Sequence, residues 1–108
     1  MKKTVLALSL LMSLVACSLI PVSVKELLTH PERYDNHTVT IRGKVVSTTK
    51  LPFMKEGMYT INDGTGQITV VTLKSLPPEG KTKTVRGRFS TAFKIMGKSF
   101  GFTITEGG

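Results

Sequence analysis

The sequence contains a single cysteine, Cys17, among its 108 residues. One thiol cannot form a disulfide within the chain, so no disulfide framework holds this protein together. Histidine is scarce too, with only His30 and His37. They flank Glu32 and Asp35, which leaves a metal site as an alternative, but two turn histidines without a cysteine are more typical of surface residues. We therefore predict no enzyme activity, no metal and no cofactor.

Acidic residues are few: the chain has 7 Asp and Glu against 15 Lys and Arg. Without Lys2 and Lys3, 13 of those basic residues remain, so the positive charge belongs mainly to the rest of the chain. Such an excess favours anionic partners. The length allows one domain at most, and a domain of this size needs a compact core.

An apolar run from Thr4 to Ala16 follows the two lysines. It has the length of a signal-peptide core and is short for a helix that spans a bilayer. The run ends in Leu14-Val15-Ala16-Cys17, which resembles the lipobox of bacterial lipoproteins, where the signal is cut before a cysteine that then carries lipid. The resemblance implies lipidation of Cys17. An uncut signal anchor, or cleavage nearby without lipidation, are the alternatives.

The lipobox resemblance also implies a location. Ser18 stands where an aspartate, in the enteric-type sorting rule, holds a lipoprotein at the inner membrane. We therefore expect a lipid-anchored protein of the bacterial envelope, attached to the outer membrane and facing the periplasm. In this interpretation residues 1–16 are the signal peptide, residues 17–22 a lipidated tether and residues 23–108 the folded domain.

Ser23 and Glu26 form a capping-box pattern, which predicts a short helix after the tether. Pro31 ends that helix. Its apolar face, which we expect to pack over one end of the domain, consists of Val24, Leu27 and Leu28. A turn is predicted over residues 34–37.

The remaining sequence alternates apolar and polar residues, which is typical of strands with one buried face. Residues 38–45 and 82–89 share one pattern, in which Thr, Arg and Lys alternate with apolar residues around a single glycine. Other strands are predicted over residues 58–62, 67–72 and 98–105, and an Asp63-Gly64 turn joins the first two of these. Loops are predicted over residues 47–57 and 90–97, a connector with room for one helical turn over residues 73–80, and a frayed end over residues 106–108.

The glycines of the two similar strands, Gly43 and Gly87, stand on the inward rows, where a side chain is expected. We expect them to mark bulges or sharp bends. Strands that curve around a small barrel need such points.

Five short strands, a glycine in the first and the fourth, and the run from Tyr59 to Val70 around Asp63-Gly64-Thr65-Gly66 resemble an OB-fold. The likeness covers roughly residues 38–105 and is similar to that of small exported bacterial OB-fold proteins and of anticodon-binding-like OB domains. It implies an all-β, five-stranded Greek-key barrel with a short N-terminal helix. Because such barrels carry many unrelated functions, the resemblance says little about the ligand.

The OB-fold strand order places the first strand beside the fourth, antiparallel. The resemblance therefore implies that the basic residues of the two similar segments project from adjacent outer faces, framed by threonine hydroxyls. These residues are Arg42, Lys44, Arg86 and Arg88. Like charges that face one another across strands cost stability, so this cluster calls for open solvent or an anionic partner. A merely solvated basic face is the alternative.

OB-folds carry ligands mainly on the outer face of the second and third strands and in two loops, between strands one and two and between strands four and five. The outer rows of those two strands contain no aromatic residue, which single-strand nucleic-acid binding usually needs. The two loops do pair aromatic with basic residues, and they form either a rim that grips a ligand or lids over the barrel mouth. The loop residues we expect to bind are Lys50, Phe53, Lys55, Phe93 and Lys94.

The sequence thus favours a lipid-anchored, non-catalytic OB-fold binding module of the envelope. The expected ligand is anionic or oligomeric: a glycan, a lipid phosphate or an acidic protein face. One alternative is a protein-interaction or structural module that uses the Phe53 and Phe93 loops. A second is a nucleic-acid-binding domain, against which export of the protein argues.

Overall fold

The structure is a computed structural model that describes residues 20–107 except 51, 53 and 96, and that leaves out the side chains of residues 93–95 and 98–100. The predicted signal peptide, Cys17 and the first part of the tether lie outside the described residues. Over the part of the chain that is described, no helix is long and apolar enough to cross a membrane.

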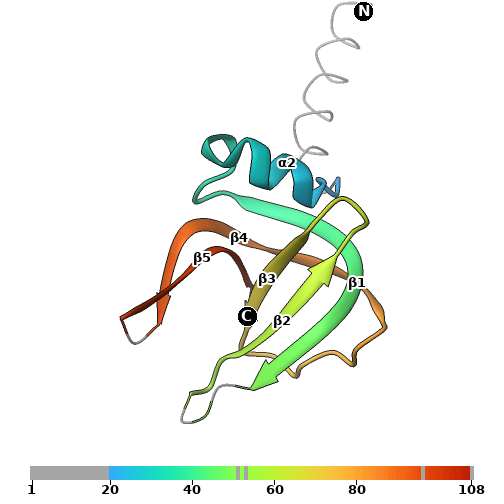
Figure 1. The fold of residues 1–108 in the computed structure, drawn as a ribbon, viewed down its shortest axis with the longest axis vertical. Coiled ribbons are helices and arrows are strands. Elements are labelled where there is room, and N and C mark those ends of the chain that lie inside the picture. The colour runs from blue at the N-terminus through green and yellow to red at the C-terminus, as the bar shows by residue number, and fades with distance from the viewer. Residues whose placement is uncertain (1–19, 51, 53, 96, 108) are drawn as a thin grey trace, which may run out of the picture.

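Five strands form a closed barrel in the order β1-β2-β3-β5-β4 (Figure 1). The strands are β1 (Thr38–Lys50), β2 (Gly57–Asn62), β3 (Gln67–Thr72), β4 (Thr82–Ile95) and β5 (Lys98–Glu106). Neighbouring strands are antiparallel except β3 and β5, which are parallel. The strongly curved β1 closes the barrel, because its first half pairs with β4 and its second half with β2. The predicted all-β, five-stranded barrel is confirmed.

The core follows from the alternation in the strands. Residues predicted to point inward are buried, and these are Val39, Ile41, Val45, Ile68 and Val70. Tyr59, Phe89 and Ile104 fill the space between them and are at most 1% exposed. Burying one such side chain contributes about 1.5 to 3 kcal/mol, so one small core suffices for a domain of this size.

Helix α2 (Val24–Thr29) lies over one end of the barrel (Figure 1). The predicted cap is present, since Ser23 Oγ accepts a hydrogen bond from the N–H of Glu26 at 3.0 Å. Val24 and Leu27 are fully buried in the core, whereas Leu28 is 39% exposed. The helix stops before Pro31, which begins a short 3-10 helix, η1 (Pro31–Arg33).

Two predicted loops are partly strand. Residues 47–50 extend β1 and pair with residues 57–60 of β2, after a register shift between Val45 and Ser47. Likewise β4 continues to Ile95 and pairs with the start of β5. The threonines at 48, 49 and 91 suit extended backbone, and each extension finds a pairing partner, which the local sequence alone does not show.

Two smaller predictions were also wrong. The connector between β3 and β4 contains no helical turn. Glu106 does not belong to a frayed end, because it is the last residue of β5, pairs with Gly87, and has a side chain only 7% exposed.

Gly43 and Gly87 occupy the predicted inward positions, but they are not bulges. The register shifts lie elsewhere, between Val45 and Ser47 in β1 and beyond Ser90 in β4. A Cβ atom at Gly43 would stand 2.5 Å from the carbonyl oxygen of Asn62, and one at Gly87 would collide with the carbonyl oxygen of Thr105. The two glycines are therefore needed because backbones approach closely where the barrel closes.

Candidate functional site

The outer face shared by β1 and β4 carries the four predicted cations, all of them exposed. We call this surface the basic seam. It consists of Arg42, Lys44, Arg86 and Arg88 together with the residues directly opposite them, Thr84, Thr82, Thr40 and Thr38. The structure thus brings together the four cations, as predicted from the OB-fold strand order.

The detail of the pairing differs from the expectation that like charges face one another. Each cation stands opposite a threonine: Arg42 opposite Thr84 and Arg86 opposite Thr40, for example. Arg42 donates a hydrogen bond from its guanidinium to Thr84 Oγ1 at 2.9 Å. No two cations are directly opposed across the strands, and Arg42 and Arg86 are diagonal neighbours at about 7 to 8 Å. Cations of the same strand, such as Arg86 and Arg88, lie two residues apart, about 6.6 Å along the strand.

Acidic side chains close to the seam already have partners. Glu106 Oε2 lies 3.3 Å from Lys83 Nζ, and its Oε1 accepts a hydrogen bond from the Tyr59 hydroxyl at 3.1 Å. The Lys83 ammonium also lies 5.4 Å from the centre of the Tyr59 ring. Burial, and then the charge of Glu106 and its hydrogen bond, raise the pKa of Tyr59. The Glu106 carboxylate therefore has two partners of its own, although it also lines the groove that Arg86 and Arg88 border.

The trio of Tyr59, Glu106 and the partly buried Lys83 was not predicted from the sequence. Lys83 stands two residues before Val85 and therefore belongs to the same inward row of β4. A lysine in an inward row was the signal that could have indicated a buried ion pair. Its partner lies 23 residues further along the chain, so that only the fold brings the two together.

Asp63 is the other acid close to the seam, and it ties the β2–β3 turn to α2. Its Oδ2 accepts a hydrogen bond from the N–H of Val24 at 2.8 Å, and its Oδ1 accepts from Thr65 and Gly66. Burial by itself would raise the pKa of Asp63, but the hydrogen bonds from Thr65, Val24 and Gly66 outweigh burial and hold that pKa below its ordinary value. Asp63 thus serves as an anchor for the helix.

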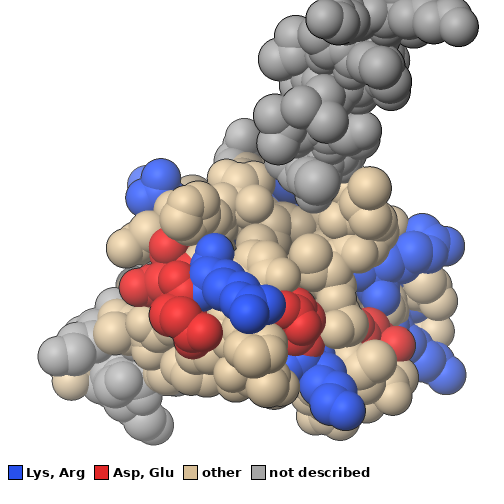
Figure 2. Space-filling view, turned by 90° about the horizontal axis from the view of Figure 1, so that it is seen from above, with Lys and Arg blue, Asp and Glu red and all other residues tan. Residues whose placement is uncertain are grey.

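On the helical end of the molecule, acidic side chains lie directly beside a basic one (Figure 2). Arg33 and Glu26 pair there at 3.4 Å. By contrast, within the described residues none of the four seam cations takes part in an ion pair. Other exposed lysines of the described chain, such as Lys25 and Lys74, lack an ion pair too, so the seam is distinguished by carrying four such cations on one face.

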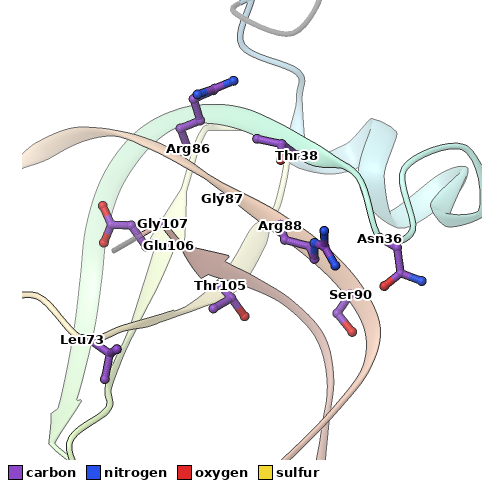
Figure 3. Close-up of a pocket in the computed structure, with 10 residues that line it drawn as sticks. All are labelled: Asn36, Thr38, Leu73, Arg86, Gly87, Arg88, Ser90, Thr105, Glu106 and Gly107. Atoms are coloured by element: carbon purple, nitrogen blue, oxygen red, sulfur yellow. The ribbon is translucent and has the colours of Figure 1, made fainter.

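A groove of about 720 Å³ borders the seam on its β5 side. Arg88 forms its centre, with Thr38 opposite on β1 and Thr105 opposite on β5. In Figure 3 the Arg88 side chain lies along the groove toward Asn36, while the Arg86 side chain points away from the other labelled residues. The groove thus offers a guanidinium flanked by hydroxyl and amide groups, and its lining also includes the Glu106 carboxylate.

The turn that carries Asn36 is fixed against β4. The N–H of Asn36 donates to the carbonyl oxygen of Phe89 at 2.9 Å, and the N–H of Phe89 donates to that of His37, also at 2.9 Å. Asn36 itself has a positive φ of 64°, which asparagine tolerates better than most residues. These contacts hold the wall of the groove in place.

The predicted loop residues are described only in part. Lys50 and Lys55 are exposed, and Lys50 Nζ donates to the carbonyl oxygen of Lys55 at 3.3 Å. Phe53 and the side chains of Phe93 and Lys94 lie outside the described residues. The loop rim therefore stays a prediction.

The outer face of β2 and β3 forms a smaller groove of about 350 Å³. Its polar lining comes from Thr60, Gln67 and Thr69. We expected no aromatic residue on this face, but Phe102 of β5 lines the groove, 36% exposed, together with Leu28 of α2. The strand pattern of β2 and β3 gave no hint of this, because the aromatic ring comes from a third strand.

The two histidines lie close to the acids that flank them. His30 Nδ1 is 3.8 Å from Glu32 Oε1, and His37 Nδ1 lies 2.9 Å from the carbonyl oxygen of Asp35. Among the residues that the structure describes, no group of three or more potential metal ligands comes together.

No protein-family model matches this sequence, and no curated protein matches it. Several solved structures are similar. A putative aspartyl-tRNA synthetase from Leishmania major Friedlin has a TM-score of 0.58 at 18% identity over 81% of this chain, which spans only 19% of the synthetase chain. The second OB-fold domain of replication protein A from Methanococcus maripaludis has a TM-score of 0.61 at 16% identity, over 82% of this chain and 91% of that domain.

A replication protein A heterotrimer bound to ssDNA is similar as well, with a TM-score of 0.59 at 20% identity, over 82% of this chain and 75% of the matched chain. At such identities a structural likeness concerns the backbone and leaves the ligand open. The strand order, the capping helix and these similarities together show that the chain has the OB fold.

Proposed function

We propose that this protein is an exported, lipid-anchored OB-fold module of the bacterial envelope that binds an anionic ligand across the basic seam, without catalysis. One observation carries the proposal: four exposed cations share one outer face, and within the described residues none of them forms an ion pair. Arginine, which supplies three of the four, binds carboxylates and phosphates through paired hydrogen bonds.

The proposed anchor would keep the seam close to a membrane. Val22, the last residue of the predicted tether, donates its N–H to the carbonyl oxygen of Thr40, in the seam, at 2.8 Å. Cys17 precedes Val22 by five residues, so the lipid would attach within about 18 Å of that point. A cation held near an anionic membrane surface gains about 1 kcal/mol, an effect that fades beyond a Debye length. On the lipobox pattern we place the protein at the outer membrane, facing the periplasm.

The proposal is tested by charge reversal. Replacing Arg42, Lys44, Arg86 and Arg88 by glutamate should abolish salt-sensitive binding to envelope extracts while the thermal unfolding transition is retained. A matched pair of variants controls for net charge: Arg42→Glu with Arg86→Glu should weaken binding, and Lys25→Glu with Lys74→Glu, both exposed and outside the paired rows of the seam, should not. Unchanged binding in the quadruple variant would exclude the seam as the binding surface.

Salt separates this proposal from a protein-interaction module that uses the Phe53 and Phe93 loops. Electrostatic binding at the seam should be lost in high salt, since exposed charges are screened. A partner held by apolar loop residues should stay bound. Pull-down from envelope extracts at low and high salt distinguishes the two.

Nucleic-acid binding is a second candidate, and one observation favours it. Phe102 and Leu28 expose apolar surface next to Thr60 and Gln67 on the outer face of β2 and β3. A base can stack on an exposed aromatic ring for about 1 to 3 kcal/mol. If an oligonucleotide binds at this face, Phe102→Ala should weaken the binding of single-stranded oligonucleotide by about 10-fold or more. If it binds at the basic seam instead, Phe102→Ala should leave its affinity unchanged.

A further inference from the structure

The four cations of the seam follow one another along its length. Thr38 and Arg88 form the first cross-strand row, Thr40 and Arg86 the second, Arg42 and Thr84 the third, and Lys44 and Thr82 the fourth. Every row holds one cation and one threonine. Rows are two residues apart, which is about 6.6 Å along a strand, so the cations extend over about 20 Å.

The cations do not converge on one point. Arg88 and Arg86 occupy successive rows of the same strand, yet their side chains point in different directions (Figure 3). Arg42 belongs to the other strand, β1, and its guanidinium is held toward Thr84 of β4 by a hydrogen bond of 2.9 Å. A compact anion would contact only part of this arrangement. An extended ligand with several charges can contact all of it.

The hydroxyls add a second recognition element. The threonine is exposed in three of the four rows, those of Thr38, Thr84 and Thr82, so a tetrahedral anionic group there meets a charged donor from one strand and a hydroxyl from the other. Thr40, in the second row, is buried, so that row offers the Arg86 guanidinium alone. A phosphodiester suits this arrangement, since its two free oxygens accept hydrogen bonds in the plane of an arginine fork. In a phosphodiester polymer the charges also belong to the backbone itself, so consecutive charges can all lie against the sheet.

We propose that the basic seam binds a linear phosphodiester polymer in extended form, with one phosphate over each of its four rows. This inference rests on the proposed function and specifies its ligand class. Two sources share this chemistry, a poly(glycerol phosphate) chain and a single-stranded nucleic acid backbone, because both place the same number of covalent bonds between successive phosphates. The groove beside Arg88 then receives one end of the bound segment, where Asn36 and Ser90 line its wall. Glu106 lines this groove too, and its carboxylate is paired with Lys83.

The test uses the full-length protein in neutral detergent and two base-free probes of increasing length: glycerol phosphate oligomers and abasic deoxyribose phosphate oligomers. Affinity should rise with each added phosphate up to four and then level off. For four phosphate contacts the plot of log K against log salt should have a slope of about −2.8, from about 0.7 for each phosphate on a single strand. Binding of either oligomer supports the proposal, and the tighter one identifies the source.

Single variants then assign one phosphate to each row. Arg42→Gln, Lys44→Gln, Arg86→Gln and Arg88→Gln should each reduce the steepness of the salt dependence by about 0.7. Lys25→Gln and Lys74→Gln remove the same charge elsewhere on the surface and should leave the slope unchanged.

Several outcomes would overturn the inference while leaving the proposed function intact. In each of them, charge reversal still abolishes binding of the envelope partner. The inference fails if inositol hexakisphosphate or anionic lipid vesicles bind as tightly as the oligomers. It also fails if an oligouronate binds with the same length dependence. A compact anion, a membrane surface or a carboxylate glycan would then be the ligand. If charge reversal leaves envelope binding unchanged and no probe binds, both the inference and the proposed function fail.

Discussion

Tyr59 and Glu106 join β2 to β5 across the interior of the barrel, through a hydrogen bond of 3.1 Å from the phenol to Oε1. The same carboxylate pairs with Lys83 of β4 at 3.3 Å, so one side chain holds three strands together. Glu106 is the one acid of β5, and these two contacts hold its carboxylate where it also lines the groove beside Arg88.

Removing that carboxylate should destabilise the fold. Glu106→Ala leaves the partly buried Lys83 without its partner and the Tyr59 hydroxyl without its acceptor, so we expect a loss of about 3 kcal/mol in the free energy of unfolding. Tyr59→Phe removes only the hydrogen bond and should cost about 1 kcal/mol. Urea denaturation measures both, with the exposed Glu79→Ala as control. Equal stability of Glu106→Ala and the unmodified protein would show that the trio contributes nothing.

Asp63 should make stability depend on pH in the acid range. Its folded pKa lies below the ordinary value of 3.8, so its contribution is fully present above that value and is lost as pH falls through the lower, folded pKa. Asp63→Asn should therefore cost about 1 to 2 kcal/mol near neutral pH, because it replaces one oxygen that accepts from the backbone. The difference from the unmodified protein should shrink as pH drops below about 4. Denaturation series at several pH values check this, and a constant difference would contradict it.

The two glycines of the barrel closure should not tolerate a side chain. Gly43→Ala and Gly87→Ala each push a Cβ atom into the backbone of a neighbouring strand, and we expect a loss of about 2 to 3 kcal/mol or failure to fold. Gly107→Ala meets nothing within 4 Å and should be close to neutral. Thermal melts of the three variants give the comparison. Wild-type stability of Gly87→Ala would mean that the strands can move apart at little cost.

The lipid anchor is tested by labelling. Radioactive palmitate should enter the full-length protein when it is made in a bacterial cell, and Cys17→Ser should prevent labelling and release the protein from the membrane fraction. Ser18→Asp, which creates the retention pattern of the enteric-type rule, should move the labelled protein to the inner membrane. If the Cys17→Ser variant stays in the membrane fraction as the unmodified protein does, lipidation is excluded as the anchor.

Much of the fold was predictable from local patterns. Alternation of apolar and polar residues identified the five strands and most of the core, because a strand places successive side chains on opposite faces. Ser23 and Glu26 indicated the helix start, which the structure confirms through a hydrogen bond to Ser23 Oγ. Patterns of this kind are written into neighbouring residues, so they can be interpreted without knowing what the chain packs against.

The tertiary structure decided which distant residues meet. Register set each seam cation opposite a threonine, extended β1 and β4 through the predicted loops, and placed Phe102 beside the β2–β3 face. It also directed Glu106 inward to Tyr59 and Lys83 and made Gly43 and Gly87 points of close contact. Each of these depends on pairing between strands that are far apart in the chain, and a shift of one residue in register would reverse which face every side chain occupies. The sequence by itself therefore determined the strands and their charge, and the closed barrel determined the surface that those charges form.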